Sequence, residues 1–176
     1  MKKNKIELIF FHIFKCGGTT FNWLLQENFP DKVIYAELPF DSKEKNLSKE
    51  ILNENVYKLI KQKEIKAISS HNMSYSCCDI GEIAFSILRD PKKRNWSAYN
   101  FQNTKVNSLS YEDYLIKNSN FQFKVLTKGK KGDKKKIVMD LLDNFKFGIL
   151  ERFDESMLFL EWICRKKGLN LDLSYS

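Results

Sequence analysis

A short stretch near the start of the chain combines residue types that bind anions. An apolar run ends at His12 and is followed by Ile-Phe-Lys-Cys-Gly-Gly-Thr-Thr, after which an amphipathic run begins at Phe21. This order predicts a strand, a tight turn and a helix. Glycine permits positive φ, so successive N–H groups can converge on an anion, and the first turn of a helix adds unpaired N–H groups and its dipole. The candidate anion-binding residues are Lys15, Gly17, Gly18, Thr19 and Thr20.

Two further polar segments follow predicted strands. Arg89 comes directly after a predicted strand at residues 83–88, and Ser97 lies on the helix predicted next. Both side chains can reach one phosphate, and the guanidinium can bind it through two parallel hydrogen bonds. His71 follows another predicted strand at residues 65–70. In an open parallel sheet, ligands bind outside the carboxyl ends of the strands, so these segments are expected to meet at one edge.

Strands alternate with helices along the whole chain. Strands are predicted at residues 6–13, 33–35, 65–70, 83–88 and 145–150, and helices at 19–28, 48–62, 92–102, 111–117, 136–144 and 153–167. This alternation predicts an α/β fold with an open, mostly parallel sheet flanked by helices. The length of 176 residues and the lack of a clear linker favour a single domain over residues 1–176. Trp96, Trp162 and the many phenylalanines are expected in the core.

Composition limits the class of partner and the compartment. Thirty Lys and Arg against twenty-two Asp and Glu give a net charge of +8, which favours anionic partners without choosing among them. The four cysteines form neither a CxxC pair nor a regular framework, so the sequence predicts no zinc site and a reduced, cytoplasmic protein. No apolar run reaches the length of a membrane span, and the basic start does not match a signal peptide.

Two motifs resemble those of the sulfotransferases that use 3′-phosphoadenosine 5′-phosphosulfate (PAPS). The resemblance is closest to the carbohydrate group, which contains the heparan 2-O-sulfating and chondroitin-sulfating enzymes. The first motif, roughly Pro-Lys-Thr-Gly-Gly-Thr-Thr, is similar to residues 14–20, with Phe14 and Cys16 as the departures. The second, Arg-Asp-Pro-x-x-Arg-x-x-Ser-x-Tyr, is matched in full by residues 89–99, and a third family-like stretch covers residues 147–156. The resemblance implies a P-loop-NTPase-like sulfotransferase fold.

The resemblance also implies how the nucleotide would be held. Residues 15–20 would bind the 5′-phosphosulfate, with Cys16 contributing its backbone N–H, while Arg89 and Ser97 would bind the 3′-phosphate. Lys15 would have a catalytic role, because its charge offsets the charge that develops on the leaving phosphate oxygen. The product would be 3′-phosphoadenosine 5′-phosphate (PAP). No metal is expected, since a sulfuryl group carries less negative charge than a phosphoryl group and no carboxylate is clearly placed to hold magnesium.

The acceptor hydroxyl, expected to belong to a glycan, needs a general base. His71 is the first candidate, because the ordinary pKa of histidine suits the role and related enzymes place a histidine here. Glu37, after the second predicted strand, is the alternative. His12 is expected to support the loop, Arg94 to brace it, and Asp90 to cap the following turn.

Other functions remain open at this stage. A P-loop kinase or NTPase shares the anion-binding physics, although Lys15 precedes the glycines where a Walker A lysine follows them. A non-catalytic basic module that binds nucleic acid or polyanionic glycans is supported by the net charge and by the stretch from Lys128 to Lys136, but nucleic-acid motifs are missing. That stretch loosely resembles a nucleotide-covering segment of cytosolic sulfotransferases and could equally attract an acidic glycan. A sulfotransferase fold that has lost its activity is a further alternative. The acceptor and the oligomeric state are not predicted.

Overall fold

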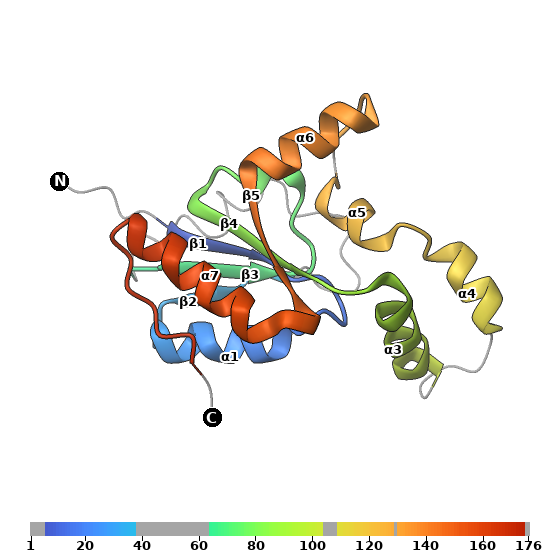
Figure 1. Ribbon diagram of the computed structural model, residues 1–176, viewed down its shortest axis with the longest axis horizontal. Helices are drawn as coiled ribbons and strands as arrows, with labels where there is room; N and C mark the ends of the chain where they lie inside the picture. Colours follow the sequence, from blue (N-terminus) through green and yellow to red (C-terminus); the bar gives the residue numbers. More distant parts are fainter. Residues whose placement is uncertain (1–5, 38–63, 104–108, 129, 175–176) are drawn as a thin grey trace.

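Five parallel strands form one sheet in the order β2-β3-β1-β4-β5 (Figure 1). The computed structural model describes residues 6–37, 64–103, 109–128 and 130–174. The strands are β1 (Ile6–Phe11), β2 (Val33–Tyr35), β3 (Ala67–Ser70), β4 (Gly81–Leu88) and β5 (Phe145–Ile149). The predicted open parallel α/β sheet is confirmed, and each of the five predicted strands is present.

The described residues also contain six helices and two short 3-10 turns. They are α1 (Gly18–Asn28), α3 (Pro91–Asn103), α4 (Tyr111–Lys117), α5 (Phe121–Leu126), α6 (Lys134–Asn144) and α7 (Phe153–Lys166), with single 3-10 turns η1 (Tyr75–Cys77) and η2 (Leu150–Arg152). The helix predicted at residues 48–62 lies outside the described residues. The sequence pattern did not predict α5, because six residues are too few to display a helical period.

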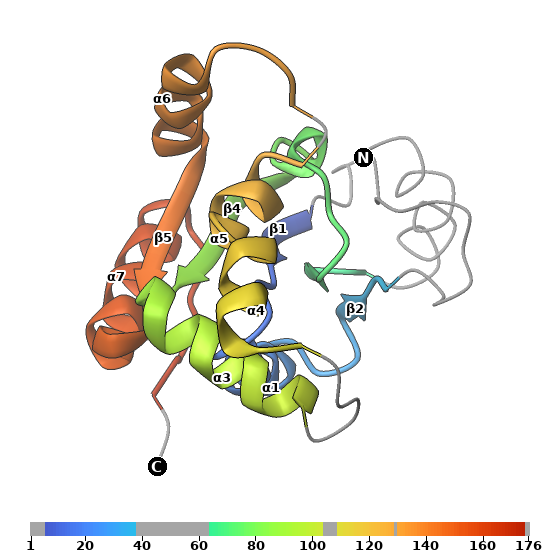
Figure 2. The same cartoon turned by 90° about the vertical axis from the view of Figure 1, so that its right-hand side faces the viewer.

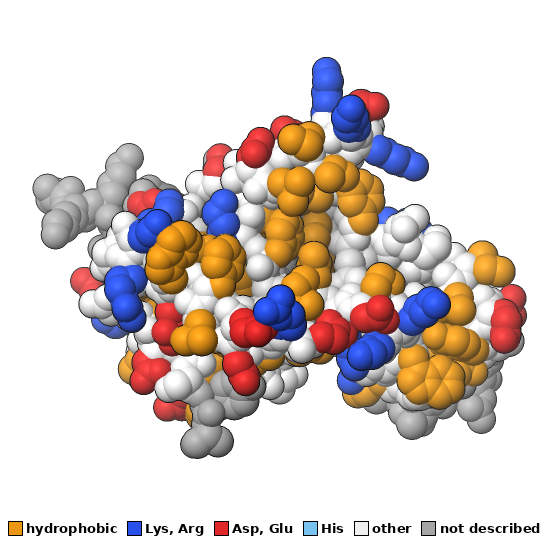
Figure 3. Space-filling model, in the orientation of Figure 1, with side chains coloured by type: hydrophobic (Ala, Val, Ile, Leu, Met, Phe, Trp, Pro, Cys, Tyr) orange, Lys and Arg blue, Asp and Glu red, His pale blue; other side chains and the backbone are white. Residues whose placement is uncertain are grey.

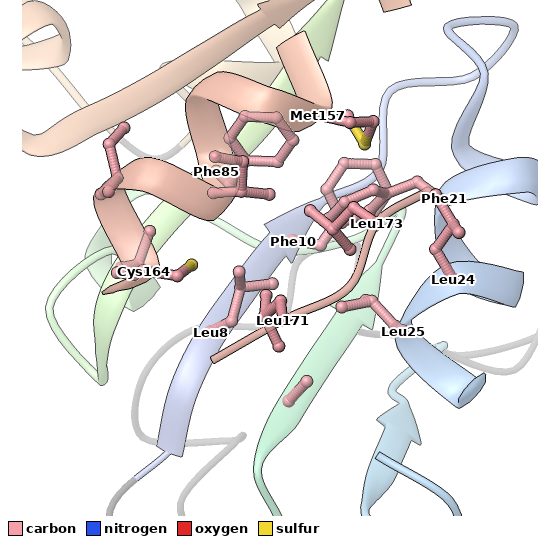
Figure 4. Packing of buried hydrophobic residues seen from close by; sticks show 14 of the residues in the cluster. Leu8, Phe10, Phe21, Leu24, Leu25, Phe85, Met157, Cys164, Leu171 and Leu173 are labelled. Carbon is pink, nitrogen blue, oxygen red and sulfur yellow. The ribbon is translucent and has the colours of Figure 1, made fainter. Parts of the chain in front are cut away.

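The sheet is covered on both faces, and the alternation along β1 shows how. Leu8 and Phe10 point to one face, while Ile9 and Phe11 point to the other. The first face packs against α1, α7 and the C-terminal tail, as Figures 1 and 4 show. The residues that α1, α7 and the tail contribute there include Phe21, Leu24, Leu25, Met157, Leu160, Cys164, Leu171 and Leu173. The second face packs against η1, α5 and α6 through residues that include Cys77, Leu126 and Leu141.

The expectation that both named tryptophans belong to the core is wrong. Trp96 and Trp162 are each 53% exposed. Trp96 lies on α3 against Tyr111, with ring centroids 5.1 Å apart, and Trp162 lies on the outer side of α7 beneath the ammonium of Lys166. Both helices are already packed through other positions, such as the fully buried Ala98 on α3, so a large aromatic ring remains on the outer surface.

The carboxyl ends of the strands meet at one edge of the molecule. Figure 2 looks onto this edge, with α3, α4 and α5 in front of it. The segments after β1, β3 and β4 begin here with His12, His71 and Arg89. The fold therefore delivers the three predicted polar segments to one edge, and the candidate site lies there.

Candidate functional site

The loop between β1 and α1 has the backbone shape of an anion-binding turn. We call residues 14–20 the anion loop. Lys15 and Gly17 have φ angles of 66° and 77°, so the chain turns sharply twice before α1 begins at Gly18. The N-cap, Gly17, supplies no capping side chain, and the first turn of α1 carries no acidic residue. The first N–H groups of α1 are therefore available to an external anion in place of a cap.

Gly18 is required because the ring of His12 lies against it. A Cβ built on Gly18 would lie 1.9 Å from His12 Nε2, closer than any two non-bonded atoms can approach. The ring of His12 also stacks on Phe10 at a centroid distance of 5.5 Å. His12 thus supports the start of α1 from beneath, as predicted.

Replacing Gly18 by alanine is expected to lower the free energy of unfolding by about 2–3 kcal/mol, because the added methyl group must displace the His12 ring from a packed position. Denaturant unfolding measures this change. Thr19→Ala is the matched control, since Thr19 is the next residue of the same helix and is exposed. Equal stability of the two variants would contradict the contact between Gly18 and His12.

His12 is held in its neutral form by its surroundings. Burial, and secondly the charge of His71, lower the pKa of His12 from 6.5 to about 4. The unfolded chain therefore binds a proton at His12 between pH 6.5 and 4 that the folded chain does not, so this residue makes folding less favourable as the pH falls through that window.

We expect His12 to account for about 2 kcal/mol of the stability lost between pH 7 and pH 4, after a reduction for the partial exposure of the ring. The measurement compares the free energy of unfolding of the wild type and of His12→Gln at both pH values. The variant should be less stable than the wild type at pH 7 and should lose less stability at pH 4. Identical losses in the two proteins would contradict the lowered pKa.

His71 is fixed in one orientation by its neighbours. Its Nδ1 lies 2.7 Å from the carbonyl oxygen of His12, and the two imidazole rings are 3.7 Å apart between centroids. Because a carbonyl oxygen can only accept, Nδ1 carries the hydrogen, and in the neutral ring Nε2 then carries the lone pair.

Glu37, which follows β2, binds the segment that begins at His71. Its carboxylate accepts a hydrogen bond from the His71 N–H at 2.8 Å and another from Asn72 Nδ2 at 2.8 Å. Both oxygens of Glu37 are therefore engaged, and the structure brings the two predicted base candidates together, with one holding the backbone of the other.

Arg89 reaches back to the anion loop. Its guanidinium donates to the carbonyl oxygen of Lys15 at 3.1 Å. Its Nε is buried and has no hydrogen-bond partner in the described part of the chain, although it forms a long ion pair with Glu151 Oε1 at 4.0 Å. A buried donor without a partner is costly, so this guanidinium is suited to an anion that would satisfy it. The uncapped start of α1 and this orphaned donor together fit a nucleotide with two anionic ends.

Gln122 holds the backbone of Arg89 in place. Its side chain accepts from the Arg89 N–H at 2.9 Å and donates to the Arg89 carbonyl at 2.7 Å. Sequence analysis missed Gln122, because it lies on the unpredicted helix α5, 33 residues from its partner. No local pattern in the sequence signals this contact.

The backbone N–H of Cys16, which is predicted to contact the nucleotide, is engaged within the loop. Its N–H donates to the Ile13 carbonyl at 3.2 Å, which closes the turn, so a nucleotide contact through this N–H would compete with that bond. Its thiol is 1% exposed and lies 3.5 Å from Gln122 Oε1, and burial raises its pKa to about 12. The thiol therefore stays protonated and packs as a small apolar group.

Arg94 braces the anion loop from α3. It is 1% exposed, donates from Nε to the Phe14 carbonyl at 3.2 Å and stacks its guanidinium 3.6 Å from the Phe121 ring centroid. Burial lowers the pKa of Arg94.

Asp90 caps the first turn of α3 by accepting from the Lys93 N–H at 2.8 Å, as predicted. Ser97 follows on the same helix and is half-buried.

The side chain of Lys15 lies beside two aromatic rings. Its ammonium is 4.7 Å from the Phe101 ring centroid and 5.9 Å from that of Phe14. The two rings meet edge to face at 5.5 Å, and Phe14 is also 6.3 Å from the His71 ring. Phe14 and Phe101 therefore form an aromatic wall beside Lys15, and Phe14 extends it toward His71.

The lysines of the basic stretch from Lys128 to Lys136 lie in different environments. Burial lowers the pKa of Lys128. The nearby carboxylate of Glu37 acts in the opposite direction and raises it. Lys130 forms an ion pair with Asp140 and lies 3.8 Å from the Tyr75 ring centroid. From Lys134 onward the stretch belongs to α6, whose first turn is capped by Asp133. Lys128 is thus a basic residue of this stretch that lies near the His71 segment.

Neither a metal-ligand cluster nor a membrane-spanning helix occurs in the described residues. In that part of the chain, no group of three or more His, Cys, Asp or Glu residues could hold a metal ion. Within the same residues, no helix combines the length and the apolar character that a membrane span needs. None of the four cysteines forms a disulfide within the described residues.

Comparison with known proteins gives structural matches alone, since no protein-family model and no curated protein matches the sequence. A sulfotransferase from Alicyclobacillus acidocaldarius matches with a TM-score of 0.50 and 16% identity over 98% of this chain and 86% of that chain. The mouse sulfotransferase SULT7A1, solved in complex with PAP, matches with a TM-score of 0.56 and 14% identity. The match covers 96% of this chain but 60% of the mouse protein. At these identities the similarity concerns the arrangement of the chain, and it shows that this protein has the sulfotransferase fold.

Proposed function

We propose that this protein is a PAPS-dependent sulfotransferase that transfers a sulfuryl group to a hydroxyl of a carbohydrate. The observation that carries the proposal is the meeting of the anion loop, His71 and Arg89 at one edge of the sheet. Among the described residues the buried Nε of Arg89 has no hydrogen-bond partner and only a long ion pair with Glu151, at 4.0 Å. The PAP bound by the mouse structural neighbour supports the same choice of nucleotide.

The anion loop and Arg89 would hold the two ends of the nucleotide. The first-turn N–H groups of α1, from Gly18 to Thr20, and the ammonium of Lys15 would bind the 5′-phosphosulfate. Arg89 and Ser97 would bind the 3′-phosphate, with the guanidinium kept in position by Gln122. Cys16 is better assigned to closing the turn than to a nucleotide contact. Fixing both ends aligns the reacting group for in-line attack.

His71 would act as the general base. The hydrogen bond from Nδ1 to the His12 carbonyl leaves Nε2 free of hydrogen in the neutral ring, so Nε2 would take the proton from the attacking acceptor hydroxyl. Glu37 would position His71, because its carboxylate already accepts two hydrogen bonds from this segment. When bound, PAPS supplies the sulfuryl group. The positive charge of Lys15 would offset the negative charge that develops on the leaving phosphate oxygen.

The carbohydrate acceptor is the finer part of the proposal. It is supported by the motif resemblance at residues 89–99 and by two features near His71. The wall of Phe14 and Phe101 offers aromatic faces against which the apolar face of a sugar ring can pack. Lys128 adds positive charge near Glu37, which suits an acidic glycan. We also propose a cytoplasmic location, in keeping with four cysteines that form no disulfide within the described residues.

The test is a transfer assay with PAPS that carries labelled sulfate, offered to neutral saccharides, acidic glycans and simple phenols without added magnesium. The proposal expects label to move to a saccharide and the transfer to be lost in His71→Ala. Transfer to phenols alone would keep the enzyme class and overturn the carbohydrate acceptor. Tight binding of PAP with no transfer to any acceptor would indicate a fold that has lost its activity. Transfer of phosphate from ATP would favour the kinase alternative.

A further inference from the structure

An exposed apolar face runs along α6, away from the candidate site. Residues spaced three and four apart occupy one side of this helix, and its apolar members, Val138, Met139 and Leu142, are 41%, 53% and 57% exposed. The opposite side of α6 is already packed into the core through Ile137 and Leu141. The exposed apolar side chains therefore do not serve the fold of the single chain.

Charged residues stand at the two ends of this face. Lys135 precedes the apolar group on the same side of the helix, and Asp143 follows it, both exposed. Neither makes an ion pair with another residue of the described part of the chain. Figure 3 shows hydrophobic side chains along α6, acidic side chains near the end of the helix that joins β5, and basic side chains, with an acidic one beside them, at its other end.

We propose that this face of α6 binds the same face of a second copy of the chain, with the two helices antiparallel about a two-fold axis at Met139. Lys135 lies four residues before Met139 and Asp143 four residues after it, so each lies about 6 Å from the axis along the helix. A two-fold rotation then places Lys135 of each copy opposite Asp143 of the other, while the apolar residues meet at the centre. The charge pattern is thus complementary to itself in this orientation.

The same pattern argues against other occupants of the face. A polyanion would be attracted by Lys135 but repelled by Asp143 at the other end of the face. A basic partner would be attracted by Asp143 but repelled by Lys135. A parallel arrangement of two copies would place like charges opposite each other. The antiparallel second copy satisfies both ends at once. Because α6 lies outside the candidate site, this proposal does not depend on the proposed function.

Sedimentation velocity of the full chain at about 100 μM, where dimers of modest affinity are populated, is the first measurement, and it should show a dimer. Met139→Glu should give a monomer, since it places two carboxylates at the axis. Ile116→Glu is the matched control, because Ile116 is 75% exposed on α4, and it should leave the dimer intact. Circular dichroism of each variant shows whether the single chain remains folded.

Charge reversal tests the register. Lys135→Glu and Asp143→Lys should each weaken the dimer by at least about tenfold, because each makes two symmetric pairs repulsive. The double variant should restore the wild-type dissociation constant to within about threefold, since the pairs are re-formed with opposite sense. A monomeric wild type, a dimer that survives Met139→Glu, or a double variant as weak as the singles would each overturn the proposal.

Discussion

Replacing Arg89 by alanine is expected to weaken the binding of PAP by about 100- to 1000-fold. A bidentate guanidinium–phosphate contact contributes two charge-assisted hydrogen bonds, which together are worth about 3–4 kcal/mol. Arg89 also donates to the Lys15 carbonyl, so its loss would loosen the anion loop as well as remove a ligand for the 3′-phosphate. Calorimetric titration of the wild type and the variant measures the change.

Two further variants distinguish the specific contact between Arg89 and PAP from a general effect of positive charge. Arg89→Lys keeps the positive charge but not the two-pronged geometry, so its affinity should fall between those of wild type and Arg89→Ala. Lys93→Ala removes an exposed positive charge from the first turn of α3 and should change the affinity by less than about threefold. Equal effects of Arg89→Ala and Lys93→Ala would mean that PAP senses net charge alone, and the assignment of Arg89 would be wrong.

Replacing His71 by alanine is expected to lower kcat for sulfuryl transfer by about 100- to 10,000-fold, the range typical of a lost general base. Binding of PAP should change little, because the nucleotide is assigned to the anion loop, Arg89 and Ser97. The measurement pairs a transfer assay on the best saccharide acceptor with calorimetry. A large loss of PAP affinity in His71→Ala would instead assign His71 to nucleotide binding.

Glu37→Gln distinguishes the two candidate bases. A glutamine keeps one oxygen that can accept the His71 N–H, but its amide nitrogen cannot accept from Asn72. If Glu37 positions His71, Glu37→Gln should retain most of kcat. If Glu37 is itself the base, Glu37→Gln should lower kcat by about 100- to 10,000-fold. His71→Ala should then lower kcat by less than Glu37→Gln does.

Much of the fold could be predicted because its signals are local. Most of the strands appear in the sequence as short apolar runs, and the ends of β2 and α4 agree with the structure to the residue. The meeting of His71 and Arg89 with the anion loop followed from one rule, that parallel strands end at the same edge of a sheet. The contact between Arg89 and Lys15, 74 residues apart, is a direct consequence of β1 and β4 being neighbours.

What could not be predicted depends on tertiary contacts. The two hydrogen bonds between Gln122 and the backbone of Arg89 require α5 to lie across the end of β4. Nothing near Gln122 in the sequence indicates this contact. The role of Glu37 depends on which of its neighbours reach its carboxylate, which the sequence does not encode locally. The exposure of Trp96 depends on Arg94 and Ala98 taking the inner side of α3.

The central claim is that the edge of the sheet formed by the anion loop and Arg89 binds an adenosine nucleotide with phosphate at both ends. Calorimetric titration of the folded wild-type protein with PAP, without magnesium, tests it most directly when compared with titration by ATP in the presence of magnesium. The account predicts saturable binding of PAP with one site per chain and much weaker binding of ATP–magnesium. A folded protein that does not bind PAP, or that binds ATP–magnesium more tightly, would contradict it.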